Sequence, residues 1–307
     1  MLAAPDHSVV GSNDVDTAVE FFTDFGLEVF HTEELSSDAS KIIYGLSGAR
    51  TQTIMRTPGA VPGIRIVETN LNTPKRGPLD TRGYSIDIYV RNMADAIEYA
   101  KSKTYVPLPV AHWELEGKSV QECRILGPNG LSVVLVGGEI MRTSLLDKDP
   151  TLAFSEINAF VNLVHDASLD CDFWTQRGGL TELRNTPFDG TPMVGLMELP
   201  QPGLKMRFAL YWAGAESVNR AKVELVSSEI SPKRLSSGSV PLAAEFGPVA
   251  FKVDFPGALE FAQRLLVGLE QTKFVTAQLE GQVRQVVRAI SPAGVAFELW
   301  CLEDCAS

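Results

Sequence analysis

The amino-acid sequence predicts an α+β protein built from four similar modules, each made of a strand, a helix and three further strands (βαβββ). Two observations predict this class. Segments that combine a strand, a capped helix and an aromatic pair recur along the chain, and apolar strands that follow a Pro-x-Gly turn recur near module ends. Segments repeated at this length indicate one supersecondary unit that is used several times.

The first and third modules carry the clearest repeat. They begin with HSVVGSNDVDTAVEFFTDFGL at residues 7–27 and AFVNLVHDASLDCDFWTQRGGL at residues 159–180. In each, an apolar run leads to an aspartate, and an aromatic pair follows seven and eight residues later. Asp14 and Asp166 are typical helix N-caps, because a carboxylate accepts from the free N–H groups of a first helical turn. The aromatic pair marks the helix face that packs on a sheet.

The second and fourth modules repeat the plan more loosely. SIDIYVRNMADAIEYAKS at residues 85–102 has Asn92 as its helix cap, and PVAFKVDFPGALEFAQRLL at residues 248–266 starts its helix with Pro-Gly. Both modules end in a Pro-x-Gly turn and an apolar strand, GPNGLSVVLVG at residues 127–137 and SPAGVAFELW at residues 291–300. The polar stretch 141–156 is the predicted linker between a domain at 1–140 and a domain at 157–307.

Composition excludes several classes of function. The net charge is −11 and no basic stripe is visible, which argues against a nucleic-acid partner. No run approaches the ~20 apolar residues of a membrane-spanning helix, and the N-terminus lacks the pattern of a signal peptide. The four cysteines show no CxxC spacing, which predicts free thiols in a reducing compartment and a cytoplasmic location.

This organisation resembles the vicinal oxygen chelate superfamily, which includes glyoxalase I, bleomycin-resistance proteins and extradiol dioxygenases. The resemblance covers nearly the whole chain and implies two half-barrel, glyoxalase-like domains, with modules one and two in the first and modules three and four in the second. Four modules in one chain can form both domains internally, so a monomer or a homodimer is expected. The resemblance also implies a divalent metal, held by the first and last strands of the modules, that acts as a Lewis acid.

The first module matches the ligand positions that the resemblance implies. His7 lies seven residues before Asp14, and Glu68 lies in GIRIVETN, the expected last strand. His7 and Glu68 are therefore the candidate metal ligands and the candidate catalytic pair. The remaining positions hold Ser85, Val134, Ala159 and Pro248, with Glu224 and Glu298 as the other two carboxylates. The metal site is thus incomplete, and one divalent ion (Zn, Ni, Mn or Fe) and no metal at all both stay open.

Four further residues are candidate substrate-binding groups. Glu298 sits inside the apolar strand VAFELW, and burial of an unpaired carboxylate there costs several kcal/mol, roughly, unless it is paired or protonated. Glu224, in AKVELVS, is its counterpart in the third module and either could act as an acid or a base. His112 and Glu114 alternate on one face of a predicted strand. Each of these side chains could equally face water.

Three kinds of function are compatible with these residues. The first is an isomerase or lyase that acts on a small hydrophobic or aromatic metabolite, with His7 and Glu68 as metal ligands or as an acid–base pair. The second is a metal-free protein that binds or sequesters a small molecule. The third is a structural role with both clefts filled. Extradiol dioxygenase chemistry needs two facing histidines, whereas only His7 stands at an expected ligand position.

Overall fold

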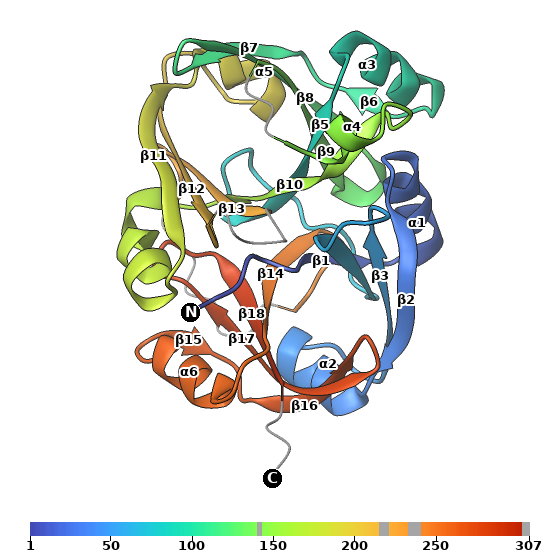
Figure 1. The fold of residues 1–307 in the computed structure, drawn as a ribbon, viewed down its shortest axis with the longest axis vertical. Coiled ribbons are helices and arrows are strands. Elements are labelled where there is room, and N and C mark those ends of the chain that lie inside the picture. The colour runs from blue at the N-terminus through green and yellow to red at the C-terminus, as the bar shows by residue number, and fades with distance from the viewer. Residues whose placement is uncertain (140–142, 215–220, 233–240, 303–307) are drawn as a thin grey trace.

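The computed structural model describes residues 1–139, 143–214, 221–232 and 241–302. These residues form two nine-stranded sheets, A and B, with short helices between the strands. Sheet B occupies the upper part of Figure 1 and sheet A the lower part. The predicted α+β class and the four strand–helix–strand modules are confirmed.

Sheet A contains both the first and the last strands of the chain. Its order is β15-β17-β18-β14-β1-β4-β3-β2, and β16 pairs with β17. The strands are β1 (His7–Ser12), β2 (Glu28–Leu35), β3 (Arg50–Arg56), β4 (Gly63–Glu68), β14 (Phe246–Val253), β15 (Glu270–Gln271), β16 (Val275–Leu279), β17 (Gln282–Ile290) and β18 (Ala296–Leu302).

Sheet B is formed by the middle of the chain. Its order is β11-β12-β13-β10-β5-β9-β8-β6, and β7 pairs with β8. The strands are β5 (Arg82–Val90), β6 (Val106–Pro107), β7 (Ala111–Leu115), β8 (Lys118–Leu126), β9 (Ser132–Gly138), β10 (Phe154–Leu163), β11 (Thr181–Asp189), β12 (Lys205–Trp212) and β13 (Lys222–Ser228).

The modules pair in a way that corrects the sequence expectation. β1 of module one pairs antiparallel with β14 of module four, His7 opposite Ala250, and β5 of module two pairs with β10 of module three, Asp87 opposite Ala159. Modules one and four therefore share sheet A, and modules two and three share sheet B. An unpaired first strand needs a partner edge, but four similar modules offer similar edges, so the sequence pattern does not reveal which edge is used.

The helices begin where the sequence places their caps. Asp14 accepts a hydrogen bond from the backbone N–H of Thr17 (3.1 Å), and Asn92 accepts one from Ala94 (3.0 Å). In the third module Asp166 caps a short 3₁₀ turn instead of a regular helix. The helical elements are α1 (Val15–Asp24), α2 (Ser37–Tyr44), α3 (Met93–Ser102), η1 (Pro128–Gly130), α4 (Leu145–Lys148), η2 (Ala167–Asp170), η3 (Phe173–Arg177), η4 (Thr191–Met193), α5 (Val194–Met197) and α6 (Ala258–Leu265).

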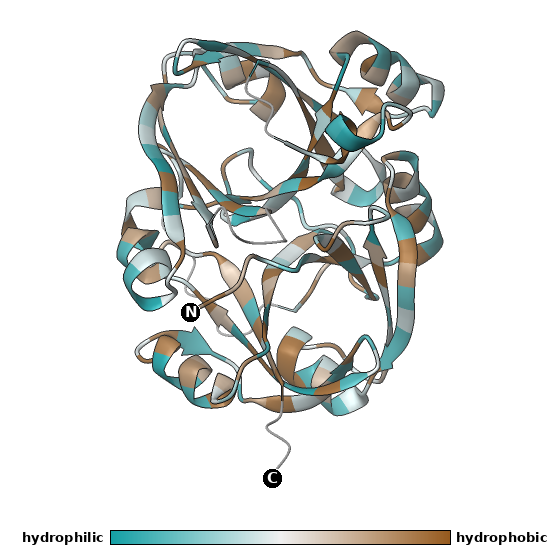
Figure 2. Ribbon diagram, in the orientation of Figure 1, coloured by the Kyte–Doolittle hydropathy of each residue, from teal (hydrophilic) through white to brown (hydrophobic). Residues whose placement is uncertain are grey.

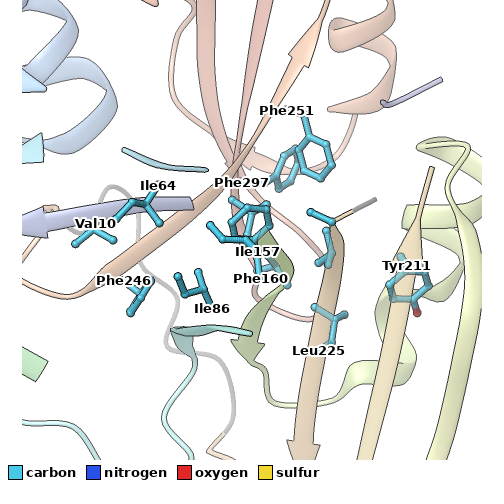
Figure 3. Close-up of a cluster of buried hydrophobic side chains, with 14 of the residues drawn as sticks. Val10, Ile64, Ile86, Ile157, Phe160, Tyr211, Leu225, Phe246, Phe251 and Phe297 are labelled. Carbon is cyan, nitrogen blue, oxygen red and sulfur yellow. The ribbon is translucent and has the colours of Figure 1, made fainter. Parts of the chain in front are cut away.

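One large core joins the two sheets. Figure 3 shows apolar side chains from β1, β4, β5, β10, β12, β13, β14 and β18 gathered in this cluster. The aromatic pairs predicted to pack on a sheet, Phe21 with Phe22 and Phe173 with Trp174, also belong to it. Hydrophilic and hydrophobic residues both occur along β2 in Figure 2, and most of this strand is exposed, including Val29 and Phe30. On its opposite face sheet B lines a cavity, whereas the opposite face of sheet A carries a second buried apolar cluster.

The segment between the two halves of the chain is more ordered than a simple linker. Residues 141 and 142 of the predicted linker 141–156 lie outside the described residues, but α4 lies within it and β10 already begins at Phe154. None of the described helices has the length and apolar character needed to cross a membrane. The described cysteines, Cys123, Cys171 and Cys301, are free thiols, and Cys305 lies outside the described residues.

Candidate functional site

The predicted pair His7 and Glu68 does not converge on one point. In the parallel ladder of β1 and β4, His7 lies opposite Gly63 and Glu68 lies opposite Ser12, at the other end. Five residues of strand separate the two positions, roughly 16 Å. His7 is fully buried, whereas Glu68 is exposed. The structure therefore contradicts a shared metal or an acid–base pair formed by these two residues.

Glu298 is buried inside sheet A and is fully paired. Its Oε1 accepts from the hydroxyl of Tyr44 (2.5 Å) and its Oε2 accepts from the indole N–H of Trp300 (2.7 Å). The buried guanidinium of Arg65 forms an ion pair with the same carboxylate. Three donors, one of them the neutralising cation Arg65, satisfy a buried carboxylate that would otherwise be costly. Glu298 is thus a structural group.

His7 belongs to a second buried polar network in sheet A. Its Nδ1 lies 2.8 Å from Oδ2 of Asp6. Burial lowers the pKa of His7 against the effect of that hydrogen bond. Burial raises the pKa of Asp6, but the hydrogen bond with His7 and the charges of Lys252 and Arg56 hold it below its ordinary value. The second ring nitrogen, Nε2, is buried with no hydrogen-bond partner.

These residues do not fit the metal that the resemblance implies. Glu68 is too distant from His7, and Glu298 is already paired with Arg65 and accepts from Tyr44 and Trp300. Among the residues that the structure describes, no three His, Cys, Asp or Glu side chains are grouped as metal ligands.

The hollow of sheet B is open and forms a cavity of about 1110 Å³. Strand alternation decides what faces it. On β5 the inward residues are Ser85, Asp87 and Tyr89, whereas Ile86 and Ile88 point to the shared core. On β13 the inward residues include Lys222 and Glu224. Ser85, Val134 and Glu224, at positions where the resemblance implies ligands, all line this cavity.

Three of the carboxyl groups that line the cavity have a raised pKa. Burial raises the pKa of Asp87 well above its ordinary value, and the charges of Glu224 and Glu122 raise it further. Burial raises the pKa of Glu224 to about 7, against the favourable charge of Lys222. Burial and the charge of Glu224 raise the pKa of Glu122 to about 8. Because Asp87 and Glu224 interact directly, this pair retains a proton near neutral pH.

Two further polar groups accompany the carboxyls. The ammonium of Lys222 donates to the backbone carbonyl of Asn158 (3.3 Å) and to its side-chain oxygen, and its charge favours ionisation of Asp87 and Glu224. The hydroxyl of Ser85 is 1% exposed and has no hydrogen-bond partner. A buried hydroxyl without a partner in a cavity wall is the kind of group that a ligand or an ordered water completes.

An aromatic cluster forms another wall of the cavity. Trp113 on β7, Phe188 on β11 and Phe208 on β12 have ring centroids 5.9–6.5 Å apart. Rings at this separation attract one another and offer a flat apolar surface. The cavity therefore combines an apolar surface, against which the body of a ligand can pack, with a small number of ionisable groups, as small-molecule sites do.

The sequence predicted one of the cavity residues and missed others. Glu224 faces the hollow as expected. His112 and Glu114 are exposed, and their neighbours Trp113 and Leu115 line the cavity instead. The expected strand is present, but its alternation is shifted by one residue relative to the prediction.

The missed residues are Asp87, Glu122 and Lys222. A usable signal was present for Asp87, because it interrupts the apolar run SIDIYV in the way that Glu298 interrupts VAFELW. Glu122 and Lys222 lie in strands that contain other polar residues, KSVQECRIL for β8 and KVELVSS for β13, so the pattern gave no comparable signal.

Comparisons with known proteins support the fold. No family model and no curated protein sequence matches the chain. Glyoxalase I from Zea mays matches with a TM-score of 0.64 and 14% identity, over 97% of this chain and 92% of that one. A putative dioxygenase from Bacillus subtilis matches with a TM-score of 0.62 and 13% identity, over 99% of this chain and 86% of that one. The chain therefore has the fold of glyoxalase I over nearly its whole length.

Proposed function

We propose that the chain binds a small molecule with an apolar or aromatic body in the cavity of sheet B and acts on it by proton transfer, as an isomerase or a lyase. The observation that carries this proposal is the Asp87–Glu224 carboxyl pair, which lines a cavity of about 1110 Å³ beside Lys222. A general acid or base works best when its pKa lies near the operating pH. The pKa of Glu224, about 7, meets that condition.

The two carboxyl groups can supply the base and the hydrogen-bond donor that an enolisation requires. Ionised Glu224 accepts a proton from a carbon next to a carbonyl group, so that a C–H bond breaks and an O–H bond forms on Glu224. Protonated Asp87 donates a hydrogen bond to the carbonyl oxygen, where the negative charge develops. For a 2-hydroxycarbonyl compound, return of the proton from Glu224 to the former carbonyl carbon, with the hydroxyl proton passing from one oxygen to the other, completes an isomerisation. For a compound with a leaving group on the other neighbour of the deprotonated carbon, departure of that group with its bonding electrons completes an elimination.

Exchange with solvent deuterium tests this chemistry without knowledge of the natural substrate. Nuclear magnetic resonance of the protein with a panel of arylalkyl aldehydes and ketones in deuterated buffer should detect exchange at the carbon next to the carbonyl. Glu224→Gln and Asp87→Asn should each slow exchange about 100-fold or more, in the range of general acid–base contributions. Glu114→Gln, on the outer face of β7, serves as the control and should exchange at the wild-type rate.

A metal-free binding function is the second candidate. It is favoured by the aromatic cluster and by Val134, an apolar residue at a position where the resemblance implies a ligand. A panel compound that raises the melting temperature without any exchange or conversion would favour this second function. Exchange that continues unchanged in both the Glu224 and the Asp87 variants would contradict the acid–base proposal.

A further inference from the structure

Of the three cavity carboxyl groups with a raised pKa, Glu122 is not used by the proposed proton transfer. Glu122 lies on β8 and faces the hollow, but no ion pair is found for it among the described residues. The charged group that acts on it there is another carboxyl, Glu224. The ammonium of Lys222 acts on Asp87 and Glu224 instead. A positive charge on a ligand would stabilise the ionised form of a half-buried carboxyl group that has no counter-ion in the protein.

The strand register sets an aromatic ring next to this carboxyl. Glu122 lies opposite Ala111, and Trp113 is two residues further along the same face of β7. Such diagonal neighbours are about 7–8 Å apart. Phe208 is likewise a diagonal neighbour of Glu224. The residue of β12 directly opposite Glu224 is Leu210, two positions along the strand from Phe208. Trp113 and Phe208 also contact each other, with ring centroids 6.0 Å apart.

A carboxyl and an aromatic surface at this spacing fit one class of compound. The protonated nitrogen of an arylalkylamine lies a few bonds from its ring, so both ends can be satisfied together. The aromatic rings themselves also attract a cation placed over their faces. The unpartnered hydroxyl of buried Ser85, in the wall of the same cavity, is a further group that a polar ligand would satisfy.

We propose that the ligand of the sheet B cavity carries a protonated nitrogen, which pairs with Glu122, and an aromatic body, which packs on Trp113, Phe188 and Phe208. The inference rests on the proposed function, since it names the chemical class that this cavity accepts. Other charged side chains in the cavity wall or at its mouth are Glu116, Lys118, Lys148, Glu156 and Arg184. Of these, Glu116 and Arg184 form an ion pair with each other.

Three compounds that share an indole-ethyl body and differ in the charge of the terminal group test the inference. Isothermal titration calorimetry of the full chain at pH 7.5 compares tryptamine (cationic), tryptophol (neutral) and indole-3-propionate (anionic). Tryptamine should bind at least tenfold more tightly than tryptophol, and indole-3-propionate should bind most weakly. Because the pKa of Glu122 is about 8, tryptamine should release protons on binding as this carboxyl ionises, which appears as a dependence of the heat on buffer ionisation enthalpy.

Two variants separate the carboxyl from the rest of the cavity. Glu122→Gln should abolish the preference for tryptamine and its proton release, while binding of tryptophol persists and shows that the cavity is intact. Glu114→Gln, on the opposite face of the same hairpin, should keep the preference.

The possible failures are distinguishable. Equal binding of tryptamine and tryptophol, tighter binding of indole-3-propionate, or a preference that survives in Glu122→Gln would overturn the ammonium inference and leave the small-molecule function standing. If none of the three compounds binds, both the inference and the proposed aromatic-binding function fail.

Discussion

At the scale of single residues, the buried carboxylates of this chain have two different fates. In sheet A, Glu298 is neutralised by Arg65 and accepts from Tyr44 and Trp300, and all of these side chains are fully buried. In sheet B, Asp87, Glu122 and Glu224 line an open cavity and keep raised pKa values. The alternation of VAFELW places Glu298 on the strand face opposite Phe297 and Leu299, but it does not tell whether that face is buried. Its partner Arg65 is 233 residues away in the chain, so no local pattern could identify it.

The Arg65–Glu298 pair gives a prediction at this scale. Arg65→Met removes the cation and leaves Glu298 charged in the interior, so the free energy of unfolding should fall by about 3–5 kcal/mol. The double variant Arg65→Met with Glu298→Gln removes the stranded charge and should recover part of that loss. Urea unfolding followed by circular dichroism measures both. Lys101→Ala, which breaks the exposed pair with Glu98, is the control and should have little effect. Wild-type stability in Arg65→Met would show that the pair contributes nothing.

At the scale of elements, one helix covers the inner face of sheet A. In the chain, α2 follows β2 and precedes β3. It begins at its cap Ser36 and ends at Gly45, whose φ of 65° suits glycine. Its side chains Ile43 and Tyr44 join the apolar cluster on the inner face of sheet A, and it packs beside β16 in Figure 1. The helix follows the first module's second strand, where the sequence analysis expected strands alone. Its eight residues are too short for a periodic signal.

Truncation of a side chain on the inward face of α2 tests whether the helix contributes to the core on sheet A. Ile43 is 1% exposed, so Ile43→Ala should lower the free energy of unfolding by about 2–5 kcal/mol through lost burial and the cavity left behind. Lys41→Ala on the exposed side of the same helix should change it by less than about 0.5 kcal/mol. Chemical denaturation of the two variants side by side gives the comparison. Similar changes in the free energy of unfolding for both substitutions would mean that α2 does not pack into the core on the inner face of sheet A.

At the scale of the whole molecule, the sequence predicts the modules but not their partners. The recurrence of caps, aromatic pairs and Pro-x-Gly turns sufficed to identify four βαβββ units, because each signal is local. The assignment of Asp87, Glu122 and Lys222 to one cavity with Glu224 was not predictable in the same way. It depends on β5 pairing with β10, and that pairing is a contact between modules with similar edges.

The observed pairing has a consequence for the two halves of the chain. Residues 1–140 contain β1 and β5, and residues 157–307 contain β14 and most of β10, so each half lacks the partner strand of both sheets. Produced alone, each half would expose two long strand edges and part of the shared apolar core. We therefore expect neither fragment to fold as a monomer, and we expect the two to co-purify in equal amounts when they are produced together.

Gel filtration and circular dichroism of the separate and the co-produced fragments check this expectation. The control is the intact chain with a protease site inserted between the halves and cut after folding. Its two pieces should still elute together and unfold in one transition, because β1–β14 and β5–β10 hold them across both sheets. Had modules one and two formed a half-barrel of their own, residues 1–140 would be a folded monomer. Observation of that monomer would contradict the sheet topology from which the cavity of Asp87, Glu122 and Glu224 is built.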